Sequence, residues 1–230
     1  MLCLVEQLGL IDYGRALELQ KRRVAERKAA KTPDTLLLLE HPHVYTFGRN
    51  ARREHLLIHP ARIEAIGAKV FETDRGGDIT YHGPGQLVGY PIFDLTGHRR
   101  DIAWYMRSLE EVFIAVAADF GIEAGRIPSL TGVWVGNAKL AALGVHISRW
   151  ITSHGFALNV RTDLRFFEWI VPCGITDKGV TSLEKLLMRS VTMEEAVERV
   201  IAQFGRVFSM DMQWEGSHLT DKLPREIEAG

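Results

Sequence analysis

Residues 35–40 are the stretch that most restricts the fold of this chain. Four consecutive leucines lie between Thr35 and Glu40, with no alternation of apolar and polar side chains. A strand of this kind is suited to a sheet that is covered on both faces. We therefore expect residues 35–40 to form a central strand.

Composition limits the architecture and excludes some functions. The chain has 230 residues, 46% of them hydrophobic, and no change in composition divides it. That is enough for one sizeable core, so we expect a single domain over residues 1–230, with residues 215–230 as a loose tail. The formal net charge of -1 argues against bulk nucleic-acid binding, which normally shows as a strongly basic face.

The ends and the hydropathy of the chain bear on its location. Residues 1–7 are too short and become acidic too soon for a signal peptide, and no apolar run reaches the roughly 18 residues of a membrane span. We expect a cytoplasmic protein with no membrane partner. In a reducing compartment its two cysteines, Cys3 and Cys173, are expected to be free thiols.

Periodicity and capping residues predict the other elements. Amphipathic helices are expected after Asp12, Asp101 and Thr192, each of which can cap a helix N-terminus. The first two helices are expected to end near Lys31 and at Gly121. Strands are expected at residues 2–8, 69–73, 87–95, 132–135, 138–147 and 152–160, and a structured loop at residues 41–49. Pro91 favours an edge or bulged position for its strand because proline has no N–H to donate.

Residues 74–86 are unusually rich in glycine. Four glycines and a proline fall within eleven residues, between Arg75 and Gln86. Glycine allows backbone N–H groups to approach a ligand, and Arg75 and His82 could hold an anion or a carbonyl there. The alternative is a long hairpin with glycine bulges. The run matches neither a dinucleotide fingerprint nor a P-loop.

Cys173 lies between Pro172 and Gly174, a setting that favours a rigid, sharply turned loop. Such a loop can display a nucleophile, although a buried cysteine in a turn is the simpler interpretation. Lys139 begins an apolar strand with no acid beside it; it could extend to water or act as the partner of the thiol. A Cys–Lys pair can move a proton in both directions, which suits a two-step acyl transfer. His82, His146 and His154 are the other residues that could approach the thiol.

A metal or other cofactor is not expected. His41 and His43 could both ligate a metal, but no third ligand stands beside them at a familiar spacing.

Four motifs in register resemble the octanoyltransferase family of lipoate biosynthesis. They are residues 75–87 (RGGDITYHGPGQL), Lys139 with Gly144, residues 153–159 (SHGFALN) and residues 172–175 (PCGI). The resemblance covers about residues 36–184. It implies an α/β (α+β) fold with a mixed sheet flanked by helices, similar to the catalytic domain of biotin and lipoate protein ligases.

The resemblance also implies an acyltransferase activity and a set of site residues. An octanoyl group would move from octanoyl-acyl carrier protein to Cys173 and then to a lysine of lipoyl domains, in 2-oxoacid dehydrogenase complexes and in the glycine cleavage H protein. Lys139 would be the acid/base. The substrate pocket would be lined by Arg75, Gly76, Gly77, Asp78, Ile79, Thr80, Tyr81, His82, Ala142, Leu143, Gly144, Gly155, Phe156 and Ala157. Acidic partners would be guided by Arg49, Arg52, Arg53, Arg75 and Arg149.

Two other functions remain open from the residues. An ATP-dependent lipoate or biotin ligase would share the fold and a lysine comparable to Lys139, but it has no need of a cysteine nucleophile. A non-catalytic binding module would form no covalent adduct with an acyl donor.

Overall fold

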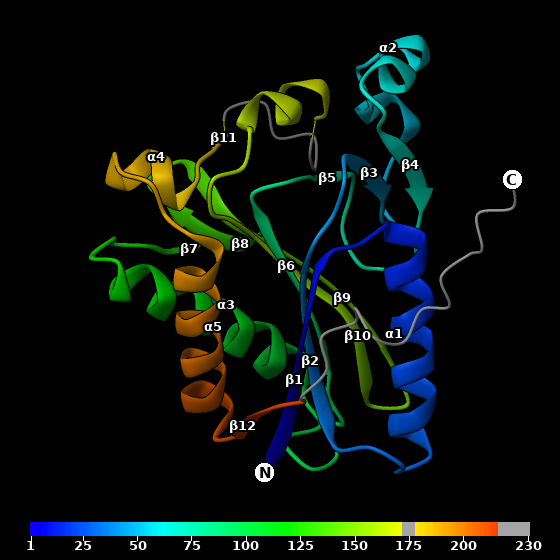
Figure 1. Cartoon of the computed structure of the whole chain (residues 1–230), viewed down its shortest axis with the longest axis vertical. Coiled ribbons are helices and arrows are strands. Elements are labelled where there is room, and N and C mark those ends of the chain that lie inside the picture. The colour runs from blue at the N-terminus through cyan, green and yellow to red at the C-terminus, as the bar shows by residue number, and fades with distance from the viewer. Residues whose placement is uncertain (172–177, 216–230) are drawn as a thin grey trace, which may run out of the picture.

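The computed structural model describes residues 1–171 and 178–215 (Figure 1). Within them, the main sheet has nine strands in the order β12-β1-β2-β6-β10-β9-β8-β7, with β11 paired to β9. These are β1 (Leu2–Leu10), β2 (Asp34–Glu40), β6 (Gln86–Ile92), β7 (Gly125–Ile127), β8 (Leu130–Val135), β9 (Ala138–Ser148), β10 (Ile151–Asn159), β11 (Gly179–Val180) and β12 (Asp211–Trp214). The sheet is mixed, because β1 pairs in parallel with β2 whereas β2 and β6 are antiparallel.

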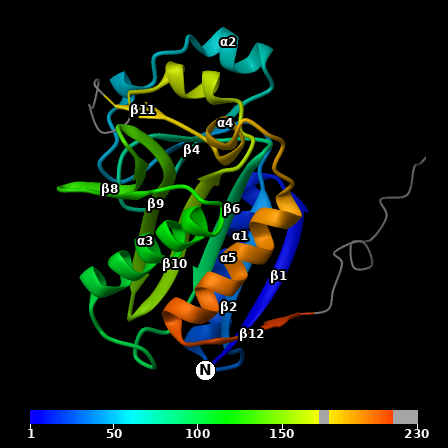
Figure 2. The ribbon, with the colours of Figure 1, turned by 90° about the vertical axis from the view of Figure 1, so that its left-hand side faces the viewer.

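Helices cover both faces of this sheet. The α-helices are α1 (Tyr13–Lys28), α2 (Pro60–Ala65), α3 (Ile102–Asp119), α4 (Leu183–Leu187) and α5 (Met193–Phe208), with short 3-10 helices η1 (Arg53–His55) and η2 (Leu164–Trp169). Figure 2 shows α3 and α5 side by side in front of the sheet, with α1 on its other side. The predicted α/β architecture, a mixed sheet flanked by helices, is therefore confirmed.

The leucine run of β2 explains why both faces are covered. Leu36 and Leu38 pack into the core that includes α3 and α5, whereas Leu37 and Leu39 pack into the core beneath α1. Alternate side chains of a strand point to opposite faces, so a run that is apolar at every position needs a layer on each side. The expected central strand is confirmed, since β2 lies between β1 and β6.

All three predicted helix caps are present. The Asp12 side chain accepts hydrogen bonds from the N–H groups of Gly14 and Arg15, and the side chains of Asp101 and Thr192 likewise cap α3 and α5. The first helix ends at Lys28, earlier than expected, because Ala30 adopts a left-handed φ of 53°.

A second, three-stranded sheet holds part of the glycine-rich segment. It consists of β4 (Lys69–Glu72), β3 (Val44–Phe47) and β5 (Thr80–His82), in that order. The loop expected at residues 41–49 therefore contains a strand. The hairpin interpretation of residues 74–86 is wrong, because β5 pairs with β3 whereas β6 pairs with β2 and β10.

Pro91 does not lie on an edge strand. Its strand, β6, is in the middle of the sheet, and its regular pairing with β10 stops at the Gly89–Phe156 pair. Beyond that pair, His154 adopts a left-handed φ of 54° and donates its backbone N–H to Gln20 on α1. Pro91 has no N–H to donate, so it is tolerated where the regular pairing with β10 has ended, and its carbonyl accepts from the Thr152 hydroxyl at 2.6 Å.

The described residues include no helix long and apolar enough to cross a membrane. The expected loose tail falls almost entirely on residues 216–230, which lie outside the described part of the chain.

Candidate active site

A cavity of about 560 Å³ lies between the glycine-rich segment and strands β9 and β10. Eleven of the predicted site residues line it: Arg75, Gly76, Gly77, Asp78, Ile79, Thr80, Lys139, Ala142, Leu143, Gly144 and Ala157. A smaller cavity of about 50 Å³ adjoins it and is lined also by His82, Gly155 and Phe156. The side chain of Tyr81 lies elsewhere, stacked on Phe166 at 4.9 Å between ring centroids, with its hydroxyl 2.7 Å from His43 Nδ1.

Arg75 is buried at the cavity wall and is tied to the backbone. Its guanidinium donates to the carbonyl and the hydroxyl of Thr46 and, at 3.0 Å, to the carbonyl of Gly76. These bonds fix the glycine-rich segment against β3. The partner Thr46 is distant in sequence, and only the fold shows that this arginine is held inside the protein rather than offered to a docking partner.

The start of the glycine-rich segment is also bonded to β9 and β10. Asp74 Oδ1 lies 2.7 Å from His154 Nε2, and its other oxygen lies 3.6 Å from His146 Nε2. Burial lowers the pKa of His154, although its hydrogen bond with Asp74 acts in the opposite direction. Burial would raise the pKa of Asp74, but its contacts with the two histidines outweigh this and lower it. Arg49 donates to His146 Nδ1 at 2.9 Å.

A series of hydrogen-bonded, buried polar side chains runs along the wall of the two cavities. His82 Nδ1 lies 2.7 Å from Gln86 Oε1, Gln86 Nε2 donates to Asn159 Oδ1 at 2.9 Å, and Asn159 Nδ2 donates to the Thr181 carbonyl at 3.0 Å. Burial is the main reason that the pKa of His82 falls to about 3. Sequence reasoning assigned no role to Gln86 or Asn159, although an amide in the apolar run of β10 already required a buried partner.

Lys139 is half-buried near the start of β9. Its Nζ lies 4.8 Å from the centroid of the Trp134 ring on β8. Its carbonyl accepts the N–H of Thr181 at 3.0 Å, and β11 runs alongside it. The side-chain nitrogen therefore faces an aromatic ring at the wall of the cavity.

Cys173 lies outside the described residues, but the residues on either side of residues 172–177 are held near the cavity. The N–H of Val171 donates to the carbonyl of His55 at 2.9 Å, and His55 Nδ1 lies 2.7 Å from Asp78 Oδ2. On the other side, Lys178 and Gly179 line the cavity. Cys3, by contrast, is buried in the core, where burial first and the charge of Asp34 second raise the pKa of its thiol.

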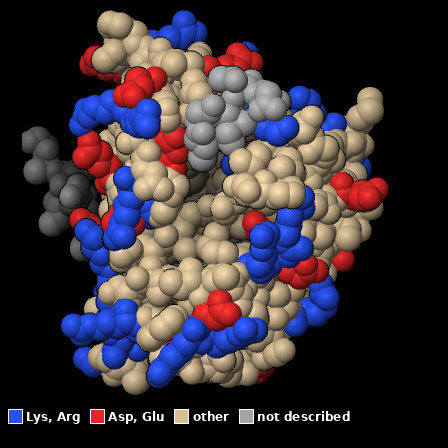
Figure 3. All heavy atoms as spheres, turned by 180° about the vertical axis from the view of Figure 1, so that it is seen from behind, with Lys and Arg blue, Asp and Glu red and all other residues tan. Residues whose placement is uncertain are grey.

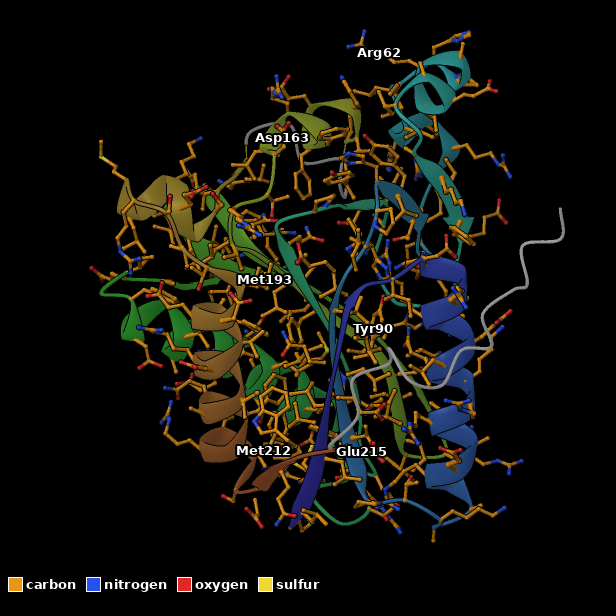
Figure 4. The ribbon with its side chains drawn as sticks, viewed as in Figure 1. Arg62, Tyr90, Asp163, Met193, Met212 and Glu215 are labelled. Atoms are coloured by element: carbon orange, nitrogen blue, oxygen red, sulfur yellow. The ribbon has the colours of Figure 1, made fainter. Side chains whose placement is uncertain are left out.

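The histidine pair considered for metal binding has other contacts. His41 is buried between the carbonyl of Ile11 and the hydroxyl of Tyr90, which lies in the core beneath α1 (Figure 4). In the described ranges, no group of three or more His, Cys, Asp or Glu could hold a metal ion.

Comparison with known proteins identifies the family of this chain. The model of the lipoyl protein ligase A/B catalytic domain matches residues 12–205. An octanoyltransferase of Solibacter usitatus is 56% identical over 91% of this chain and 94% of its own, and one of Caldicellulosiruptor bescii is 51% identical over 89% and 91%.

Solved structures of ligases share the fold at low identity. Lipoate-protein ligase A bound with ATP is 15% identical, with a TM-score of 0.74 over 93% of this chain and 87% of its own. Biotin protein ligase of Aquifex aeolicus in complex with biotin and ATP is 13% identical, with a TM-score of 0.56 over 90% and 70%. The expected likeness to both ligase folds is confirmed, and the relatives at half identity or more show that the chain belongs to the octanoyltransferase family.

Proposed function

We propose that this protein transfers an octanoyl group from octanoyl-acyl carrier protein to a lysine of a lipoyl domain, through a thioester on Cys173. Its close relationship to octanoyltransferases over nine-tenths of the chain carries this proposal. The cavity supports it, since Lys139 lies in its wall and the residues that flank the Cys173 segment lie beside it.

In the first half-reaction, the Cys173 thiol gives its proton to the neutral amine of Lys139. The thiolate attacks the carbonyl carbon of the donor thioester, forming the Cys173 S–C bond, and the carbon–sulfur bond to the carrier then breaks. The leaving thiolate takes the proton back from Lys139. A thiol with a pKa near 8.5 is mostly protonated at neutral pH, so this exchange supplies the nucleophile.

In the second half-reaction, the ε-amine of the acceptor lysine attacks the acyl-enzyme. The carbon–nitrogen bond forms and the bond to Cys173 breaks. Lys139 accepts the proton that the amine loses and passes it to the Cys173 thiolate. The thioester donor already carries the activation, so neither half-reaction requires a nucleotide or a metal.

The cavity suits an extended acyl chain. Its volume of about 560 Å³ falls within the usual range for sites that bury small ligands. Gly144 is in close contact with the opposite wall, since a Cβ there would lie 3.0 Å from the carbonyl oxygen of Gly76. Small residues thus keep the groove narrow, and apolar residues such as Leu143 and Val145 line it.

Protein partners would be guided by charge. Figure 3 shows a hollowed face on which Lys and Arg side chains flank the hollow, interspersed with Asp and Glu. Of the predicted arginines, Arg49, Arg52, Arg53 and Arg149 are exposed, and only Arg75 is buried. Arg53 is paired with Glu72. We propose that Arg49, Arg52 and Arg149 attract the acidic carrier and the lipoyl domain.

Intact-protein mass spectrometry with octanoyl-acyl carrier protein tests the proposed function. One octanoyl mass should be added to the protein, and peptide mapping should place it on Cys173. Cys173→Ala should form no adduct and transfer no octanoyl group, whereas the matched Cys3→Ala variant should still form one. An adduct that persists in Cys173→Ala, or transfer that depends on ATP, would contradict the proposal.

A further inference from the structure

We propose that the side-chain amides of Gln86 and Asn159 are positioning groups for the reaction, because they fix β11 against the part of β9 that carries Lys139. This inference rests on the proposed function of Lys139 and Cys173. It assigns a role to two buried residues that line the same cavity but have no part in the proposed chemistry.

Asn159 lies at the point along β9 where β11 replaces β10 as the neighbouring strand. Strand β10 pairs with β9 as far as the Leu158–Ala141 pair, and Asn159 is the next and last residue of β10. Beyond this point β11 takes the place beside β9, pairing with Ala138 and Lys139. The Asn159 side chain spans the junction by donating to the carbonyl of Thr181, the residue that follows β11.

Gln86 holds Asn159 in the orientation that this contact requires. The two residues are directly opposite each other on β6 and β10. Gln86 Nε2 donates to Asn159 Oδ1 and to the Tyr81 carbonyl, so its Oε1 accepts from His82. Because Asn159 Oδ1 is an acceptor, its Nδ2 is the atom that faces Thr181. A neutral His82 therefore donates through Nδ1–H, so the hydrogen bonds from His82 to Gln86, from Gln86 to Asn159 and from Asn159 to Thr181 have consistent directions.

The contact matters because β11 is too short to keep its position through backbone pairing alone. It has two residues, fewer than the three to ten usual for a strand. The N–H of Thr181 donates to the Lys139 carbonyl, and the carbonyl of Thr181 accepts from the Asn159 side chain. Thr181 is thus clamped between Lys139 and Asn159, and it lies just beyond the segment that bears Cys173. Loss of the amide contact should release β11 and disturb the relation between the two reacting side chains.

A comparison of Asn159→Ala with Gln213→Ala, which removes an exposed amide on β12, tests this inference. Hydrogen exchange reports on β11 directly. Exchange at the amides of Gly179 and Thr181, which donate to the carbonyls of Asn137 and Lys139, should be at least 10-fold faster in Asn159→Ala and unchanged in Gln213→Ala. Unchanged exchange in Asn159→Ala would overturn the inference whatever the activity. Asn159→Asp keeps the side-chain shape and the acceptor for Gln86 but loses the donor, so it repeats the test with little change in packing.

A kinetic cycle with Lys139→Ala separates positioning from general loss of structure. Asn159→Ala should lower kcat for octanoyl transfer about 10- to 100-fold with KM for the donor changed less than about threefold. In the Lys139→Ala background, Asn159→Ala should lower kcat less than about threefold, because the effects of substitutions in groups that act as a unit are not additive. A full loss in both backgrounds would overturn the inference. Failure of the proposed function would instead appear in the wild type, as absence of the Cys173 adduct.

Discussion

The side-chain nitrogen of Lys139 lies over the indole ring of Trp134, with Nζ 4.8 Å from the ring centroid. The two residues are paired across β8 and β9, so the sheet itself sets this contact. The face of an indole favours a cation. Removal of the Trp134 ring should therefore make the protonated form of Lys139 less stable.

Replacement of Trp134 tests this relationship. Trp134→Leu should lower the pKa of Lys139, destabilise the thiolate–ammonium pair with Cys173 and slow alkylation of that thiol at neutral pH by about 2- to 30-fold, the range expected from 0.5–2 kcal/mol. Trp134→Phe retains an aromatic face, so it should slow alkylation less than Trp134→Leu does. The measurement is the rate of reaction with iodoacetamide against pH. Equal profiles for wild type and Trp134→Leu would remove Trp134 from this role.

Two glycines of the cavity should respond differently to an added methyl group. A Cβ at Gly155 would lie 2.3 Å from the Gly89 carbonyl oxygen and 2.5 Å from Pro91 Cδ, so backbone must move. Gly155→Ala should lower the free energy of unfolding by about 1–3 kcal/mol, as overpacking does. At Gly144 the contact is 3.0 Å, to the Gly76 oxygen, and Gly144→Ala should mainly reduce transfer by narrowing the groove.

Urea unfolding and steady-state kinetics of both glycine variants check this expectation. Gly125→Ala is the matched control, because no atom lies within 4 Å of a Cβ at that position. A Gly155→Ala protein as stable as the Gly125→Ala control would show that the sheet accommodates the methyl group.

The elements that sequence reasoning predicted correctly are those fixed by local chemistry. Asp12, Asp101 and Thr192 cap their helices through contacts within three residues. The four consecutive leucines of β2 by themselves indicate a strand that is buried on both faces. Such features need no knowledge of the fold.

What sequence reasoning missed depends on partners far along the chain. Arg75 is bonded to Thr46, and the strand of Pro91 is interior because it pairs with β2 and β10. The residue types are visible in the sequence, but their partners are set by the sheet order. The site residues were predicted from motifs as a set, whereas the amide chain behind them follows only from the pairing of β6 with β10.

Stability should fall in mild acid because two buried histidines resist protonation. Burial is the main cause that lowers the pKa of His41 to about 4 and that of His82 to about 3. In the unfolded chain both titrate near 6.5. Below that pH the unfolded state binds protons that the folded state does not, so stability present above pH 6.5 is lost as the pH falls toward the folded values.

The slope of unfolding free energy against pH measures this effect. Between pH 6 and pH 5, His41 and His82 should together contribute up to two protons, about 2.7 kcal/mol per pH unit. His82→Asn should reduce the slope by close to one proton, with exposed His59→Asn as the matched control. A slope that does not change in His82→Asn would mean that this histidine is protonated in the folded protein.

The exposed arginines should govern how fast protein partners dock. Arg49 and Arg149 are both exposed, on the segment after β3 and in the turn between β9 and β10. Reversing their charge in Arg49→Glu/Arg149→Glu should raise KM for octanoyl-acyl carrier protein severalfold at low salt and flatten its dependence on ionic strength, because steering by exposed charges is screened by salt. The measurement is kcat/KM between about 20 and 300 mM salt, with Arg206→Glu, at an exposed position on α5, as the control.

A small acyl thioester donor separates docking from chemistry, since its turnover should be the same in wild type and in the double variant. If the double variant keeps the wild-type salt dependence with the carrier protein, the partners dock elsewhere on the molecule.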